Sequence, residues 1–226
     1  MIKLSSTVEA IFAGGIALLE PEGHRTGMFK RQVVHRITVT SQGIEGDQQA
    51  DRRVHGGPEK AVHHFPAENY VHLSRKYPQC AKELTPGSLG ENLSTRGLNE
   101  GNVHIGDVFR VGDTLLQVSQ PRSPCWKINH RFGIDDLSVT VARDRVTGWY
   151  YRVLRPGSIG PEDSMELVDR QTNRLSIFEF WRIQLEHRPS VDELVDVANV
   201  QGLSAEWKNR FMQRAAWLKQ AGIALL

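Results

Sequence analysis

Cysteine is scarce in this chain of 226 residues, which contains only Cys80 and Cys125. Two thiols cannot build a disulfide framework, and they cannot supply the cysteine cluster of an iron–sulfur domain. No apolar stretch is long enough to span a bilayer, and the N-terminal residues lack the apolar run of a signal peptide. We therefore expect a cytoplasmic protein without a membrane partner, in which a free thiol stays reduced.

An excess of charge of one sign is missing as well. The chain carries 28 basic and 26 acidic side chains, for a net charge of +2. This balance is too even to attract nucleic acid or a membrane surface in bulk, so we expect no nucleic-acid partner. Neither a Gly-x-Gly-x-x-Gly motif nor a phosphate-binding loop of the Walker type occurs, so a nucleotide-binding fold is not supported.

The first two thirds of the sequence consist of short apolar segments separated by glycine-rich turns. Gly112 and Asp113 are a strong signal for a two-residue hairpin turn. Residues 67–76 and 136–146 are expected to be helical. The expected strands are residues 8–17, 32–40, 61–65, 103–111, 114–119, 149–154 and 165–168. Many short strands with few helices predict a closed or nearly closed β-barrel.

The pattern changes to helical near residue 170. Ser176 and Ser190 each precede a glutamate by three residues and an apolar run, which is the capping-box pattern of a helix start. Ser204 can cap a third helix at residues 205–220. We therefore predict a mainly β fold with added helices: a β-barrel domain at residues 1–170 and a small three-helix domain at residues 171–226.

The last predicted helix has one apolar face, formed by Trp207, Phe211, Ala215 and Leu218. The two helices around Gly202 resemble a helix-turn-helix in spacing, but we favour packing of this face over DNA binding. Because the apolar faces of the tail need cover, a homodimer through these helices is a further expectation.

The less ordinary cysteine lies in residues 120–127, Gln-Pro-Arg-Ser-Pro-Cys-Trp-Lys, between a strand and a segment that can be helical. Arg122 and Lys127 flank Cys125, and both cations and a helix N-terminus favour thiolate over thiol. A thiolate is a nucleophile and a soft metal ligand. The local sequence leaves a functional thiol and a buried structural cysteine equally open, whereas Cys80 has no flanking cations and fits the structural role.

Basic side chains recur at Arg52, Arg53, Lys60, Arg122 and Lys127. They form either a solvated surface or an electropositive pocket for a phosphorylated small molecule, and the pair beside the cysteine favours the pocket.

Histidines offer further candidates. His55, beside Gly56 and Gly57, is suited to hydrogen bonding with an anionic ligand. His63 and His64 are adjacent in a strand, so they face opposite ways and do not share a zinc ion. A thiol hydrolase that uses Cys125 with His130 as its base remains an alternative.

Five short motifs in one order make the chain resemble the MOSC family, named for the C-terminal domain of molybdenum-cofactor sulfurase. Its tail resembles the small helical domain of the YiiM branch of that family. The motifs are Gly-Ile-Glu-Gly-Asp at 43–47, Val-His-Gly-Gly at 54–57, Gly-Glu-Asn-Leu-Ser at 90–94, Ile-Gly-Asp at 105–107, and residues 120–127.

This resemblance implies a β-barrel that binds molybdenum–molybdopterin, with Cys125 as the catalytic residue and the metal ligand. It also implies reduction of N-hydroxylated compounds, such as hydroxylamino-purine base analogues, to amines. The chain has no nicotinamide, flavin or iron–sulfur signature, so an external reductase is expected to deliver the electrons. A carrier that binds the cofactor or sulfur without turnover is the alternative. The residues implied to hold the cofactor are His55, Gly56, Gly57, Glu91, Asn92, Arg122 and Lys127.

Overall fold

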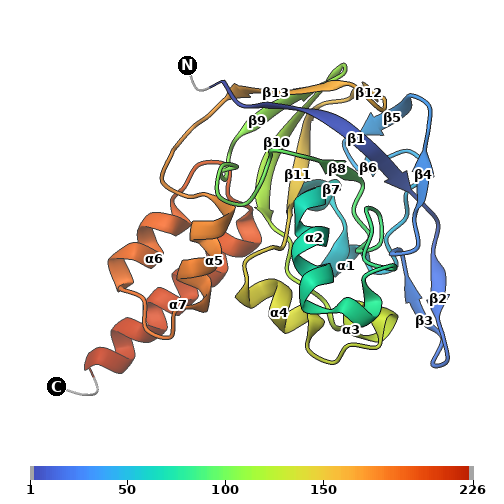
Figure 1. Ribbon diagram of the computed structural model, residues 1–226. Helices are drawn as coiled ribbons and strands as arrows, with labels where there is room; N and C mark the ends of the chain where they lie inside the picture. The colour runs from blue at the N-terminus through green and yellow to red at the C-terminus, as the bar shows by residue number, and fades with distance from the viewer. Residues whose placement is uncertain (1–2, 224–226) are drawn as a thin grey trace.

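Figure 1 shows a computed structural model of the protein, in which a β-barrel carries helices on two sides. The structure describes residues 3–223, apart from the side chains of residues 53, 54 and 221–223. The strands are β1 (Ser5–Ala13), β2 (Ala17–Leu19), β3 (His24–Thr26), β4 (Arg31–Val33), β5 (Ile37–Thr40), β6 (Gly43–Ile44), β7 (Val62–His64), β8 (Leu93–Thr95), β9 (Val108–Val111), β10 (Thr114–Pro121), β11 (Trp149–Arg155), β12 (Gly157–Ile159) and β13 (Ser164–Asp169). The α-helices are α1 (Arg52–His55), α2 (Ala67–Lys76), α3 (Trp126–Phe132), α4 (Leu137–Arg143), α5 (Ile177–Leu185), α6 (Val191–Ala198) and α7 (Ala205–Ile223).

Seven of the described strands close into the barrel, in the order β13, β9, β10, β11, β7, β8, β1. Closure comes from β1, which pairs with β13 at its start, where Ser5 faces Glu166, and with β8 further along. The strand β4 extends the sheet beyond β1, and β12, β5 and β6 form a separate small sheet. The mainly β fold with added helices that the sequence predicts is therefore confirmed.

Alternating burial explains why β9 and β10 pair as the sequence predicts. Phe109, Leu116 and Val118 are fully buried in the barrel core. The turn between the strands has Gly112 at a φ of 51°, a left-handed conformation that glycine adopts without strain. The predicted hairpin around Gly112 and Asp113 is confirmed.

Two predicted strands are wrong in their extent. Residues 8–17 do not form one strand, because β1 ends before Gly14, where a Cβ atom would lie 2.9 Å from the carbonyl oxygen of Phe29. Residues 32–40 form two strands, since β4 pairs with β1 whereas β5 pairs with β12 in the other sheet. Val34, 78% exposed, lies where the chain leaves one sheet for the other.

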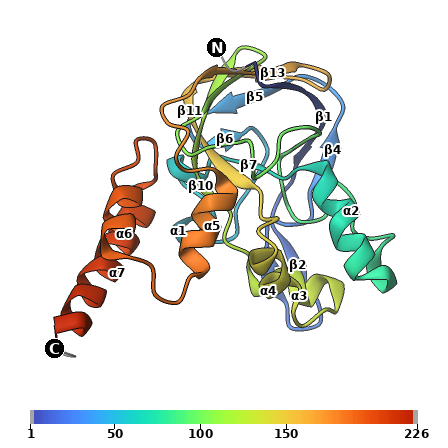
Figure 2. The ribbon, with the colours of Figure 1, turned by 60° about the vertical axis from the view of Figure 1, so that its left-hand side comes forward.

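The three C-terminal helices lie on one side of the barrel, as Figure 2 shows. Ser176 Oγ accepts a hydrogen bond from Glu179 N at 3.0 Å, and Ser190 Oγ makes the same contact with Glu193 N, so both predicted caps are confirmed. None of the helices within residues 3–223 is both long and apolar enough to cross a bilayer.

The apolar face predicted for the last helix is buried at Trp207, Phe211 and Ala215. These side chains share one hydrophobic cluster with barrel residues such as Ile105 and Phe109. Packing is therefore continuous across residue 170, and the division into two domains there stays a prediction.

A second hydrophobic cluster lies between the barrel and helices α2, α3 and α4. Phe65, Leu73, Ile128 and Leu137 are fully buried in it. Ile128 belongs to α3, so this cluster fixes the helix that directly follows the cysteine loop.

Candidate cofactor-binding site

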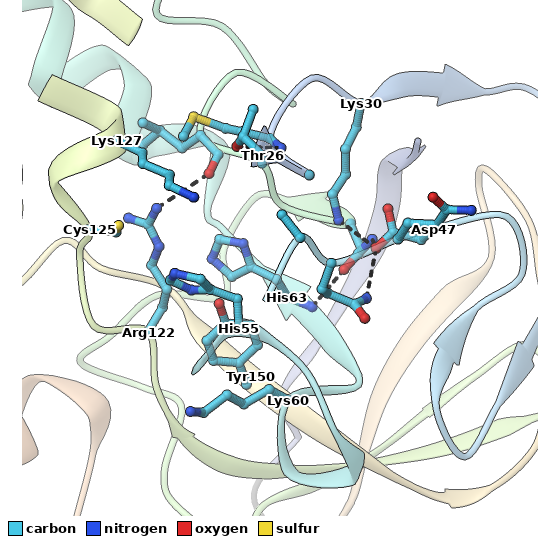
Figure 3. A pocket seen from close by; sticks show the side chains of 18 residues that line it. Thr26, Lys30, Asp47, His55, Lys60, His63, Arg122, Cys125, Lys127 and Tyr150 are labelled. Atoms are coloured by element: carbon cyan, nitrogen blue, oxygen red, sulfur yellow. Dashed lines mark hydrogen bonds and ion pairs between the residues drawn. The ribbon is translucent and has the colours of Figure 1, made fainter. Parts of the chain in front are cut away.

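A cavity of about 90 Å³ lies at one end of the barrel, between segments that are far apart in the sequence. Figure 3 shows Lys30 and Asp47 on one side of it, Arg122, Cys125 and Lys127 on the other, and histidine rings between them. Its lining is Thr26, Gly27, Met28, Lys30, Asp47, Gln48, Gln49, Ala50, His55, Lys60, His63, Leu89, Gly90, Asn92, Arg122, Cys125, Lys127 and Tyr150.

Cys125 reaches the cavity because the chain changes from strand to helix around it. Pro121, which has no N–H to continue the ladder, ends β10. Arg122 N then donates to Gly148 O at 3.1 Å, and Cys125 immediately precedes α3 in an extended conformation. Its thiol is half-buried.

Two cations flank the thiol, Arg122 from the loop before α3 and Lys127 from the first turn of α3. Arg122 is 6% exposed, and its Nη1 has no hydrogen-bond partner among the described residues. Its Nη2 donates to Leu89 O at 3.5 Å. Lys127 Nζ donates to Arg25 O at 2.6 Å, which holds its ammonium group against the β2–β3 hairpin. The cavity is therefore electropositive next to Cys125.

The opposite wall is built around the Asp47 carboxylate. Lys30 Nζ lies 2.7 Å from Asp47 Oδ2, and both side chains are almost completely buried. Asp47 also accepts from Gly14 N at 3.1 Å and from Asn92 Nδ2 at 3.0 Å. Asn92 Oδ1 in turn accepts from His63 N at 3.0 Å. Burial lowers the pKa of Lys30, and the nearby Asp47 acts in the opposite direction. This network fixes the loop that carries Asp47, the strand β7 and the segment around Asn92 relative to one another.

The histidines of the cavity are neutral. Burial lowers the pKa of His55 to about 4, and the cations Arg122, Lys127 and Lys60 add to the effect. Burial, with Arg122 and Lys30, lowers the pKa of His63 well below its ordinary value. His63 Nε2 has no partner among the described residues, so it is a second buried polar atom available to a ligand.

We expect Arg122→Gln to raise the pKa of His55 from about 4 toward the ordinary histidine value. Removing a neighbouring positive charge makes the imidazolium form less costly, so the shift is upward. A pH titration of the imidazole resonances by NMR measures it. His104, whose pKa is lowered by burial and by Arg170, is the internal control and should keep its value, because Arg122 is not among the charges that act on it. An unchanged or lowered pKa of His55 would contradict the electrostatic coupling.

The structure brings five of the residues predicted for the site together on the cavity: His55, Asn92, Arg122, Cys125 and Lys127.

Three other predicted site residues are absent from the cavity lining in the described part of the chain. Gly56 and Gly57 form the turn before residues 58–60, where Gly57 has a φ of 88°. Glu91 turns away and accepts hydrogen bonds from Tyr70 Oη at 2.6 Å and from Gly87 N at 2.5 Å. Their direct role in holding a cofactor stays a prediction.

The sequence pattern does not predict Lys30 and Tyr150 as site residues, and it presents His63 only as a possible zinc ligand. Tyr150 is the middle residue of Trp149-Tyr150-Tyr151 in β11, and burial raises the pKa of its hydroxyl while Arg122 acts against this. The adjacent His63 and His64 do face opposite ways. His64 is bonded to Tyr151 Oη at 3.1 Å on the side away from the cavity residues.

The other candidate chemistries find less support in the geometry. His130 lies against Glu22, with Nε2 2.5 Å from Oε2, and among the described residues it lines neither the cavity nor any other space that Cys125 borders. Cys80 is buried and its Sγ donates to Phe132 O at 3.3 Å, as expected for a structural thiol. Within residues 3–223, no group of three or more His, Cys, Asp or Glu side chains is arranged to hold a metal ion.

Comparison with known sequences gives one consistent family. The profile of the MOSC domain matches residues 51–166. Protein YiiM of Escherichia coli strain K12 is 39% identical over 194 residues, which cover 86% of each chain. YflK of Bacillus subtilis strain 168 is 36% identical over 87% of this chain and 88% of its own. A protein named Reductase from Gibberella moniliformis is 32% identical over 76% of this chain, which is 30% of that longer protein.

Comparison with solved structures extends the likeness to the helical tail. YiiM from Escherichia coli aligns with a TM-score of 0.78 at 32% identity, covering 93% of this chain and 92% of its own. YiiM from Geobacillus stearothermophilus aligns with a TM-score of 0.79 at 30% identity, covering 93% of this chain and 99% of its own. The resemblance in the five motifs is thereby confirmed, and the chain belongs to the MOSC domain family, in its YiiM-like branch.

Proposed function

We propose that this protein is a molybdenum-cofactor-dependent reductase of N-hydroxylated compounds, with the Cys125 thiolate as a ligand of the metal. The observation that carries the proposal is a half-buried thiol on one electropositive cavity together with two buried atoms, Arg122 Nη1 and His63 Nε2, that have no hydrogen-bond partner among the described residues. MOSC domains are associated with the molybdenum cofactor. The fungal relative named Reductase supports an oxidoreductase.

The residues of the cavity fit the chemistry of such a cofactor. Molybdopterin carries a phosphate, and a guanidinium with an unpaired N–H binds phosphate well. Arg122 and Lys127 would hold the anionic part, and His63 Nε2 would pair with a polar edge of the pterin. Thiolate is a soft ligand suited to a metal that already carries sulfur ligands. Asn92 has its amide groups engaged with Asp47 and β7, so its part is to keep this wall in place.

The overall conversion takes an N–OH group, two electrons and two protons to an N–H group and water. When bound, the cofactor supplies the metal centre at which the N–O bond is broken and through which the two electrons pass. An external reductase delivers the electrons. His55 lines the cavity beside Cys125, and an anion bound there would raise the pKa of His55, so that its ring could hold a proton. Tyr150 keeps its hydroxyl proton, because burial raises its pKa.

We expect protein purified from a host that makes the cofactor to contain close to one molybdenum atom per chain. With a strong chemical reductant as the electron source, this protein should convert an N-hydroxylamine to the amine. Elemental analysis and chromatography of the reaction measure the two outcomes separately. Metal-free protein would refute the cofactor assignment. Protein that holds molybdenum but leaves the N-hydroxylamine unchanged would identify a cofactor carrier instead.

A further inference from the structure

A groove of about 490 Å³ adjoins the cavity, and the two share Cys125 together with His55, Lys60, Lys127 and Tyr150. The rest of its lining is Asp51 before α1, Gln120 at the end of β10, Ser123 and Pro124 in the loop before α3, Trp126 at the start of α3, and Glu206 and Arg210 in the first turns of α7. The groove therefore gives a second approach to the thiol, between the barrel and the C-terminal helices.

Helix α7 forms a fixed wall of this groove. Ser204 N donates to Ser119 O at 2.9 Å, which joins the start of the helix to β10. Glu206 Oε2 lies 2.9 Å from Lys60 Nζ, and Glu206 Oε1 lies 2.7 Å from Arg210 Nη2. The carboxylate of this wall is thus neutralised by two cations of the protein itself.

Gln120, at the end of β10, is a groove side chain whose amide oxygen receives no such compensation from the described residues. It is 2% exposed, and its Oε1 has no hydrogen-bond partner among the described residues. A buried carboxamide oxygen without a donor is unfavourable, because the water that it would bind has been removed. A ligand N–H in the groove would satisfy it, while the amide nitrogen of Gln120 can donate to a neighbouring acceptor on the same ligand.

Trp126 adds a flat apolar surface to the same groove. Its side chain is 49% exposed although it is large and aromatic. Its ring makes T-shaped contacts with His24 of the β2–β3 hairpin, at 5.0 Å between centroids, and with His130 of α3, at 6.2 Å, and these two contacts orient the indole. An exposed indole of fixed orientation is suited to stacking with a planar ring.

We propose that this groove binds the organic part of the substrate, and that Gln120 is the residue that determines its specificity. The favoured ligand is a planar ring that bears a hydrogen-bond donor next to an acceptor, as in an amide or amidine. The carboxamide of Gln120 pairs with that edge while the ring lies against Trp126. This inference rests on the proposed function, because it places the reacting end of the ligand toward Cys125.

The test is a binding measurement, so it can fail independently of N–O reduction. Benzamide and acetophenone have nearly the same shape and the same acceptor, but acetophenone has a methyl group where benzamide has its N–H donors. Full-length protein from a cofactor-producing host is titrated with each compound, and the indole N–H resonance of Trp126 is followed by NMR. We expect benzamide to bind about tenfold more tightly than acetophenone. Acetophenone cannot donate a hydrogen bond to Gln120 Oε1, and the loss of one such paired hydrogen bond weakens binding by about this factor.

In Gln120→Met, which keeps the volume but removes both hydrogen-bonding groups, the two compounds should bind equally. Gln117→Met on the same strand is the matched control, because Gln117 bonds to Arg152 Nη1 at 2.8 Å and is not part of the groove lining. It should keep the tenfold preference. Equal binding of the two compounds by the unmodified protein would overturn the inference, whether or not the Gln120→Met protein folds.

Discussion

Cys125→Ser is expected to purify without bound molybdenum and to lose N-hydroxylamine reduction by more than about 100-fold. The estimate is a lower bound, because changing even the outer partners of a metal ligand typically costs about 10–100-fold in affinity or activity. Serine keeps the size and the hydrogen-bonding capacity of the side chain but replaces soft sulfur with hard, protonated oxygen. The half-buried position of Cys125 before α3 tolerates this exchange, so the fold should be unaffected.

Cys80→Ser provides the matched control, since it is the same substitution at the other thiol. Its hydroxyl can replace the sulfur as donor to Phe132 O, and the site lies away from the cavity. This variant should keep its molybdenum and its activity. Equal metal content and equal activity in Cys125→Ser and unmodified protein would reject Cys125 as a ligand.

Asp47→Ala should lower the free energy of unfolding by about 3–5 kcal/mol, which is the usual effect of removing one partner of a buried ion pair. Lys30 would keep its buried ammonium without a counter-ion, and Gly14 N and Asn92 Nδ2 would each lose an acceptor. Burial already lowers the pKa of Lys30, and loss of Asp47 removes the interaction that opposes this. Urea unfolding followed by circular dichroism measures the change.

Two further variants separate the ion pair from general sensitivity of the fold. Lys30→Met with Asp47→Leu removes both charges and should recover part of the lost stability, because no unpaired buried charge remains. Glu166→Ala breaks an exposed contact with Arg110 at 4.0 Å and should change the unfolding free energy by less than about 1 kcal/mol. A loss below about 1 kcal/mol in Asp47→Ala would contradict the structural role of the pair.

The parts of the fold that the sequence predicts are those set by local rules. The serine caps, the Gly112 turn and the apolar face of α7 depend on residues within a few positions of one another, and all are present. The division of residues 32–40 into β4 and β5 depends on which distant strands are available as partners. The pattern of apolar residues within the segment does not show which strands will pair with it. The sequence therefore predicts one strand where the structure has two.

The residues of the candidate site also fall into those that local sequence predicts and those that depend on distant contacts. Arg122 and Lys127 could be predicted because they lie within three positions of Cys125 along the chain and line the cavity with it. Lys30 could not, since a lysine beside a strand normally lies at the surface. It becomes buried only because Asp47, 17 positions along, is folded against it. Tyr150 gave no local signal either, because its orientation depends on the pairing of β11 with β7.

The pairing of Ser5 with Glu166 determines when the barrel can form during synthesis. The start of β1 has no strand to pair with until the ribosome has produced β13, about 160 residues later. At about 5–20 residues per second, this interval is on the order of ten to thirty seconds, during which one edge of β1 remains unpaired. Contacts so distant along the chain also slow folding. Until β13 emerges, the start of β1 is therefore an open strand edge that can pair with other chains.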